Sequence, residues 1–182
     1  RFSNYVEEFE YLINSGITIP SHAISNPKYP LAESQQKNLL KLYMNDVGML
    51  TSQLYHYNIQ PILNDIASIN LGSVYESAVA QELKAHYEKL FYYDNKQKGE
   101  VDFLVDDSST MSVLPIEVKS GKDYTVHSAL DNLMAIQDYY IVSSIVLSNE
   151  REIKTKGNIL YLPVYYVMFL ENKVPEKENL YF

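Results

Sequence analysis

Two short segments of the chain combine acidic residues and a lysine in a pattern that suits metal-dependent phosphodiester chemistry. Residues 100–105 carry Asp102 among apolar neighbours, and residues 115–119 carry Glu117 and Lys119 two positions apart. Both segments are apolar enough to predict strands, and side chains along a strand alternate between its two faces. We therefore expect Glu117 and Lys119 to share one face, opposite Ile116 and Val118, with Asp102 on a neighbouring strand. By the same alternation Asp102 should lie opposite its odd-numbered neighbours at 101, 103 and 105.

Carboxylates placed in this way favour a bound Mg²⁺ or Mn²⁺, because both ions prefer hard oxygen ligands and leave room for water and phosphate oxygens. A metal held by Asp102 and Glu117 would polarise a phosphoryl group and lower the pKa of the attacking water. Lys119 would position that water or offset the charge that develops on the phosphoryl oxygens. The alternative is a self-neutralising Glu117–Lys119 surface pair, which is common on strands. Asp102 is harder to explain in that way, since charged residues seldom interrupt an apolar strand.

The segments around this pattern predict an α/β domain. Hydrophobic periodicity and turn residues predict elements in the following order: a helix at 72–90, strands at 91–93, 100–105 and 113–118, a helix at 128–139, strands at 141–147 and 159–162, and a helix at 164–170. Such an order indicates a mixed sheet flanked by helices.

The upstream part has a different pattern. A helix is predicted at 4–15, extended segments at 17–24 and 39–44, and a loop at 25–34. We interpret residues 1–57 as a truncated winged-helix-like or linker segment and residues 58–177 as the main domain, entered through a connector that is partly helical at 62–69. The final residues, 178–182, resemble the remnant of a protease-site tag and are expected to have no part in the function.

Composition limits the classes of function. The 182 residues include no cysteine, so disulfides and thiolate zinc sites are excluded. The formal net charge of -8 argues against tight autonomous DNA binding, which depends on neutralising phosphates. It does not exclude a nuclease, because carboxylates that hold a metal count as negative until the metal binds. Since no apolar run could span a bilayer and no signal-peptide pattern is present, we expect a cytoplasmic protein with no membrane partner.

Four segments together resemble a known family. They are residues 43–50 (YMNDVGML), 72–76 (GSVYE), 100–103 (EVDF) and 116–120 (IEVKS). In this order they look like the C-terminal domain of a large prokaryotic family of AAA-type ATPases, a domain of unknown function that is related to PD-(D/E)XK nucleases. The resemblance extends from about residue 5 to about residue 170. It implies a restriction-endonuclease-like PD-(D/E)XK core preceded by the winged-helix-like segment.

The resemblance also implies a role for each site residue. Glu76 would be a helix-borne metal ligand, Asp102 and Glu117 the central ligands, and Lys119 the catalytic lysine. All four residues are present in the chain. Many nuclease relatives also place a glutamine on the helix after the lysine strand. Gln137 is the candidate here, although its spacing to Tyr140 is one residue shorter than the usual pattern, and an ordinary helix-surface role is the alternative.

Two functions follow as hypotheses. The first is a Mg²⁺-dependent phosphodiesterase that acts on DNA under the control of an ATPase domain in the same polypeptide. The second is a non-catalytic docking module of the ATPase that retains the nuclease fold. Residues 120–123 (SGKD) superficially resemble a phosphate-binding loop, but the first glycine and the final Ser or Thr are missing, so we expect no ATP site here. The oligomeric state is left open.

Overall fold

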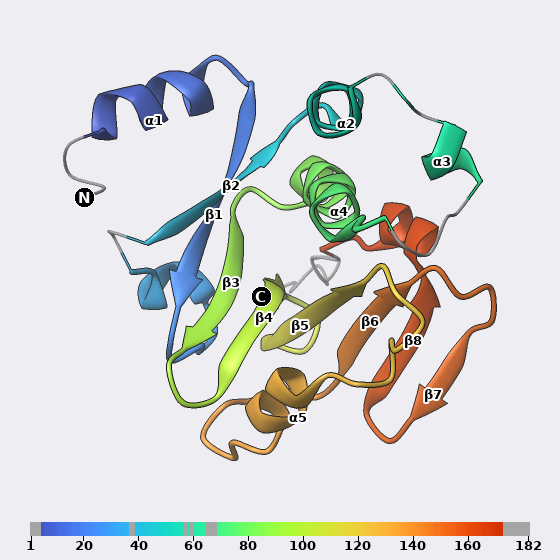
Figure 1. Cartoon of the computed structure of the whole chain (residues 1–182). Coiled ribbons are helices and arrows are strands. Elements are labelled where there is room, and N and C mark those ends of the chain that lie inside the picture. Colours follow the sequence, from blue (N-terminus) through green and yellow to red (C-terminus); the bar gives the residue numbers. More distant parts are fainter. Residues whose placement is uncertain (1–4, 37–38, 57, 59, 65–68, 173–182) are drawn as a thin grey trace, which may run out of the picture.

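The fold is built around one mixed sheet (Figure 1). The computed structural model describes residues 5–36, 39–56, 58, 60–64 and 69–172. Within these residues eight strands form a single sheet with the order β2-β1-β3-β4-β5-β6-β8-β7. The strands are β1 Thr18–Ile24, β2 Leu40–Met44, β3 Leu90–Asn95, β4 Gly99–Asp107, β5 Ser112–Lys119, β6 Ser144–Ser148, β7 Lys154–Lys156 and β8 Ile159–Pro163. The predicted mixed sheet flanked by helices is confirmed.

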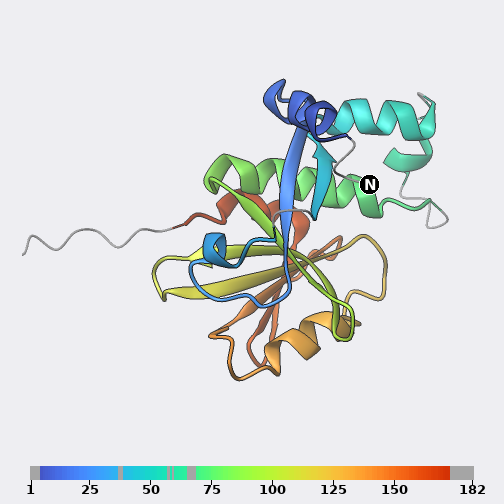
Figure 2. The ribbon, with the colours of Figure 1, turned by 90° about the vertical axis from the view of Figure 1, so that its left-hand side faces the viewer.

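Helices cover both faces of this sheet. They are α1 Val6–Asn14, α2 Val47–Tyr55, α3 Gln60–Leu63, α4 Gly72–His86 and α5 Ser128–Met134, with 3₁₀ helices η2 Leu31–Ser34 and η3 Val164–Phe169. Figure 2 shows α4 and η3 on one face of the sheet and α5 on the opposite face. Among the described residues, no helix is both long enough and apolar enough to cross a membrane.

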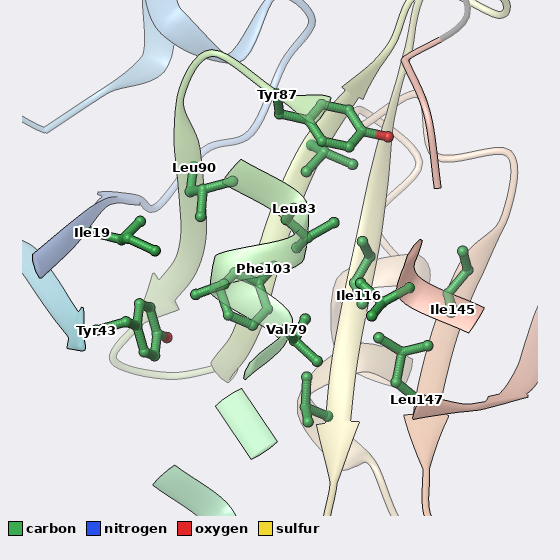
Figure 3. Close-up of a cluster of buried hydrophobic side chains, with 14 of the residues drawn as sticks. Ile19, Tyr43, Val79, Leu83, Tyr87, Leu90, Phe103, Ile116, Ile145 and Leu147 are labelled. Atoms are coloured by element: carbon green, nitrogen blue, oxygen red, sulfur yellow. The ribbon is translucent and has the colours of Figure 1, made fainter. Parts of the chain in front are cut away.

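The longest helix, α4, packs on the sheet through a buried stripe. Val79, Leu83 and Tyr87 recur every four residues, which places them on the same side of the helix. The stripe contacts fully buried side chains of the central strands, including Phe103 and Ile116 (Figure 3). This packing fixes α4 against β4 and β5, the two strands that carry the predicted site residues.

A second cluster fills the space on the other face. Leu130 and Leu133 of α5 are fully buried there, together with Leu104 of β4 and Val146 of β6. The predicted helix at 128–139 ends at Met134, earlier than expected. The next position of its buried stripe would be residue 137, which is a glutamine, so continuing the helix would gain little apolar burial.

The first two strands belong to the same sheet as the others. β1 pairs in parallel with β3, and β2 pairs antiparallel with β1. Tyr43 of β2 is buried, and its ring centroid lies 5.3 Å from that of Phe103 in β4. The sheet therefore does not follow the boundary that we expected at 57/58, because the strands that we assigned to a winged-helix-like segment continue the central sheet. Residues 1–4, 37–38 and 57 of that segment, and the tag-like residues 178–182, lie outside the described residues.

Several element boundaries differ from the prediction. The helix expected at 72–90 ends at His86, because the chain turns extended at Tyr87 and enters β3 at Leu90. The C-terminal helix expected at 164–170 is the 3₁₀ helix η3. Helix α2 was not predicted, although Asp46 supplies an N-cap signal: its carboxylate accepts a hydrogen bond of 3.0 Å from the Met49 N–H. Strand β7 was also missed.

The packing between α4, β2 and β4 gives a stability prediction. We expect Phe103→Ala to lower the free energy of unfolding by about 3–5 kcal/mol, because the fully buried ring leaves a cavity. Phe169→Ala is the matched control: this ring is 64% exposed, so its removal should cost less than about 1 kcal/mol. Urea unfolding of both variants measures the difference. Equal losses would contradict the assigned core.

Candidate active site

The β4–β5 pair brings the two central carboxylates together. The antiparallel register places Phe103 opposite Ile116, and one further step along it places Asp102 beside Glu117. On the other side of β4 the pairing with β3 contains a β-bulge, in which Asp102 and Phe103 together face Tyr92. Bulges of this kind bend a strand and re-aim its side chains.

The bulge corrects the simple alternation expected for β4. Val101 lies in the core cluster beneath α5, whereas Phe103 and Val105 lie in the cluster beneath α4. Asp102 therefore does not stand opposite all three of its odd-numbered neighbours. One extra residue in a strand moves every side chain that follows it to the opposite face of the sheet.

Asp102 is held at the end of the β4–β5 ladder. Its Oδ2 accepts a hydrogen bond of 2.7 Å from the Val118 N–H of the neighbouring strand. Burial and the neighbouring charge of Glu117 raise the pKa of Asp102 from 3.8 to about 7. The Val118 N–H, Lys41 and Lys119 lower it only in part. The carboxyl group therefore titrates near neutral pH.

Glu117 is the most deeply buried acid of the site. Its side chain is 8% exposed, and Oε1 forms an ion pair of 2.7 Å with Lys119 Nζ. The other oxygen, Oε2, is buried and has no hydrogen-bond partner among the described residues. Burial raises the pKa of Glu117, and Lys119 opposes that rise. The lone pairs of this buried oxygen are therefore not used by any described residue.

Glu76 reaches the same region from the first half of α4. It is half-buried, and burial followed by the charge of Asp102 raises its pKa. Tyr43 lies next to it: burial and then the charges of Glu76 and Asp102 raise the tyrosine pKa. The helix that packs over β4 and β5 therefore adds a third carboxylate to the neighbourhood of Asp102.

Two residues of this site were missed in the sequence. Lys41 and Tyr43 lie on β2, two positions apart, and Lys41 forms an ion pair with Glu100 at the start of β4. Lys41 also lowers the pKa of both Asp102 and Glu76. A Lys-x-Tyr spacing carries little information by itself. Only the pairing of β1 with β3 reveals that β2 lies near β4.

A cavity of about 320 Å³ opens beside Glu76. It is enclosed by β2, α2 and the first turns of α4, and its lining is as follows: Lys41, Leu42, Tyr43, Met44, Leu50, Ser73, Glu76 and Ser77. Its volume lies at the lower end of the range for small-ligand pockets. The cavity thus adjoins the carboxylates through Glu76 and Lys41.

The predicted residues are thus partly assembled. Asp102, Glu117, Lys119 and Glu76 influence one another electrostatically. No group of three His, Cys, Asp or Glu side chains among the described residues is arranged closely enough to hold a metal ion. Gln137 lies in an exposed turn beyond the end of α5 and not on the helix that was expected to carry it.

The donor set nevertheless fits a divalent cation that prefers oxygen. Mg²⁺ is commonly bound by only one or two carboxylates, with water and substrate phosphate as the other ligands. Asp102 and Glu117 supply two carboxylates on adjacent strands, and the buried Oε2 of Glu117 has no partner among the described residues. A cation would also relieve the repulsion that raises the pKa of Asp102.

Comparison with known proteins gives one match. A family model described as "Domain of unknown function (DUF4143)" matches residues 71–167, more than half of the chain. The chain belongs to this family. Searches of curated proteins and of solved structures found no match. The part that matches DUF4143 contains Glu76, Asp102, Glu117 and Lys119, whereas β1 and β2, and with them Lys41, lie outside it.

The raised pKa of Asp102 predicts an unusual dependence of stability on pH. The folded protein binds this proton more tightly than the unfolded chain, so the free energy of unfolding should fall as pH rises from about 4 to about 7. Asp102→Asn keeps an acceptor for the Val118 N–H but cannot ionise. In urea unfolding with EDTA, we expect the variant to exceed wild type by on the order of 3 kcal/mol at pH 8 and to match it near pH 4. Parallel pH profiles would refute this interpretation of Asp102.

Proposed function

We propose that this domain is a metal-dependent phosphodiesterase of the PD-(D/E)XK type that acts on DNA. The observation that carries the proposal is the pairing of Asp102 with Glu117 on adjacent strands, with Lys119 two residues after Glu117. This arrangement provides a partly neutralised carboxylate pair with a lysine at its edge. The mixed sheet with helices on both faces is compatible with a nuclease core.

Asp102 and Glu117 would hold the cation, and Glu76 would join them from α4. A bound Mg²⁺ or Mn²⁺ would supply Lewis-acid polarisation of the phosphate and a more acidic water. The chain's own contribution is to orient the two carboxylates. The Val118 N–H fixes Asp102, and the antiparallel register fixes Glu117 beside it. Neither carboxylate depends on a loop for its position.

Lys119 would change partner during the reaction. Its ammonium group now neutralises Glu117 Oε1, and its side chain is 29% exposed. If Glu117 shared its charge with a bound cation, Lys119 would be held less tightly. Its ammonium group would then contact a phosphoryl oxygen or orient the attacking water, and so stabilise charge that develops in the transition state.

The wider context of the proposal comes from the resemblance of the sequence to the C-terminal domains of AAA-type ATPases. In that setting an ATPase domain of the same polypeptide, in the cytoplasm, would control access of DNA to the site. The net charge of -8 favours this arrangement, because a domain so acidic needs help to capture a polyanion.

A second function, docking of the ATPase or another partner, is favoured by two observations. Lys119 is closed onto Glu117, so the pair is also consistent with a purely structural role. In addition, an open groove of about 240 Å³ runs between α4 and η3, where Tyr165 is 53% and Met168 47% exposed. Exposed apolar side chains beside a groove are typical of protein-binding surfaces.

Metal binding separates the two functions. We expect calorimetric titration with Mn²⁺ at pH 8 to show binding at millimolar concentrations or tighter to wild type, and roughly tenfold or greater weakening in both Asp102→Asn and Glu117→Gln. Since the ligands must be deprotonated, binding should weaken progressively below pH 7. DNA cleavage should require the metal and should be lost in the same variants.

Glu82→Gln is the control, because this residue lies on the same helix as Glu76 but lines the groove between α4 and η3. It should bind Mn²⁺ as wild type does. Absence of binding to wild type at millimolar Mn²⁺ would reject the phosphodiesterase and leave the docking module as the better account.

A further inference from the structure

Lys41 occupies a special place between the carboxylates and the cavity bounded by β2, α2 and α4. It forms an ion pair with Glu100, and its Nζ lies 4.8 Å from the centre of the Tyr92 ring. Its side chain is 26% exposed, so Lys41 is only partly covered by its neighbours. An ammonium above an aromatic face is held in position while it keeps its charge.

The charges around Lys41 show why a phosphodiester would need a positively charged group here. Four acids, Glu76, Glu100, Asp102 and Glu117, face two lysines, Lys41 and Lys119, which leaves a formal charge of -2. A phosphodiester would be repelled from such a surface unless a positive group receives it. The proposed function assigns Lys119 to the phosphate that is cleaved, so a neighbouring phosphate needs a different cation. Among the described residues that line the cavity, only Lys41 has a positively charged side chain.

The volume and lining of the cavity suit part of a nucleic-acid strand. Its volume is about 320 Å³, and the hydroxyl-bearing Ser73 and Ser77 of α4 line it together with Leu50 of α2. Such a mixed lining combines hydrogen-bonding groups with apolar surface, as ligand pockets usually do. It opens next to Glu76, so a strand bound there would pass directly by the carboxylates.

We propose that this cavity is a nucleic-acid subsite in which Lys41 binds a backbone phosphate adjacent to the phosphate that is cleaved. The inference rests on the proposed phosphodiesterase function. It assigns the substrate as a single strand, or a strand end, since one unpaired nucleotide must enter the cavity. Glu100 holds Lys41 ready in the free protein and releases it when the phosphate arrives.

The test measures binding of a fluorescein-labelled single-stranded oligonucleotide by fluorescence anisotropy. Ca²⁺ is present in place of Mg²⁺, because both ions bind oxygen ligands. Lys41→Gln should weaken binding roughly fivefold or more. The slope of log binding constant against log salt concentration should fall by about one, as expected for the loss of one phosphate contact. Glu100→Gln should tighten binding, because it frees Lys41 and removes a negative charge. Lys41→Arg should restore binding. Lys156→Gln, the same change on the distant edge strand β7, should have no effect.

A second pair of variants tests the cavity itself. Ser73 is exposed at the mouth of the cavity, and Ser73→Trp should fill it and weaken oligonucleotide binding. Gln81→Trp places the same bulk two turns further along α4, outside the cavity, and should bind as wild type. Urea unfolding confirms that all variants fold cooperatively.

The outcomes distinguish this inference from the function on which it rests. If wild type binds Mn²⁺ and the oligonucleotide but Lys41→Gln and Ser73→Trp bind it equally well, the subsite is refuted and the phosphodiesterase stands. If wild type binds neither Mn²⁺ nor the oligonucleotide, the phosphodiesterase fails and the subsite fails with it.

Discussion

A buried glutamate beside a partly buried aspartate imposes the main constraint on this structure. Asp102 and Glu117 lie on adjacent antiparallel strands, where burial and the charge of Glu117 together raise the cost of ionising Asp102. A backbone N–H from Val118 and the ammonium group of Lys119 compensate for part of this repulsion, but one oxygen of Glu117 remains without a partner among the described residues. Uncompensated charge in a protein interior is costly, so its presence points to a function that uses it.

The architecture around the pair serves to hold it in place. The buried stripe of α4 packs over β4 and β5 and delivers Glu76 to the neighbourhood of Asp102. On the other face, α5 covers β4 through a separate cluster. The N-terminal strands complete the site, because the contact between Tyr43 and Phe103 brings β2 over the start of β4 and places Lys41 near the acids. Residues far apart in the sequence thereby form one charged region beside one cavity.

Much of this arrangement could be predicted from the sequence. Periodicity located α4 and the strands that carry Asp102 and Glu117, and alternation placed Glu117 beside Lys119, as their ion pair shows. Local patterns could not reveal the bulge at Asp102, which arises from the pairing of β4 with β3. Nor could they place β1 beside β3, because such a parallel pairing joins segments more than sixty residues apart. Lys41 was missed for that reason. Gln137 was expected on a helix, but α5 ends before it, where the buried stripe of the helix ends.

The central claim is that Asp102 and Glu117 form a cation site. The most direct measurement is a crystal structure of the protein grown at pH 8 with Mn²⁺, in which the anomalous difference map locates the metal. We predict a peak about 2.0–2.4 Å from carboxylate oxygens of both residues. Lys119 should then have moved away from Glu117. A map with no peak at this position, and with Lys119 still paired to Glu117, would contradict the account.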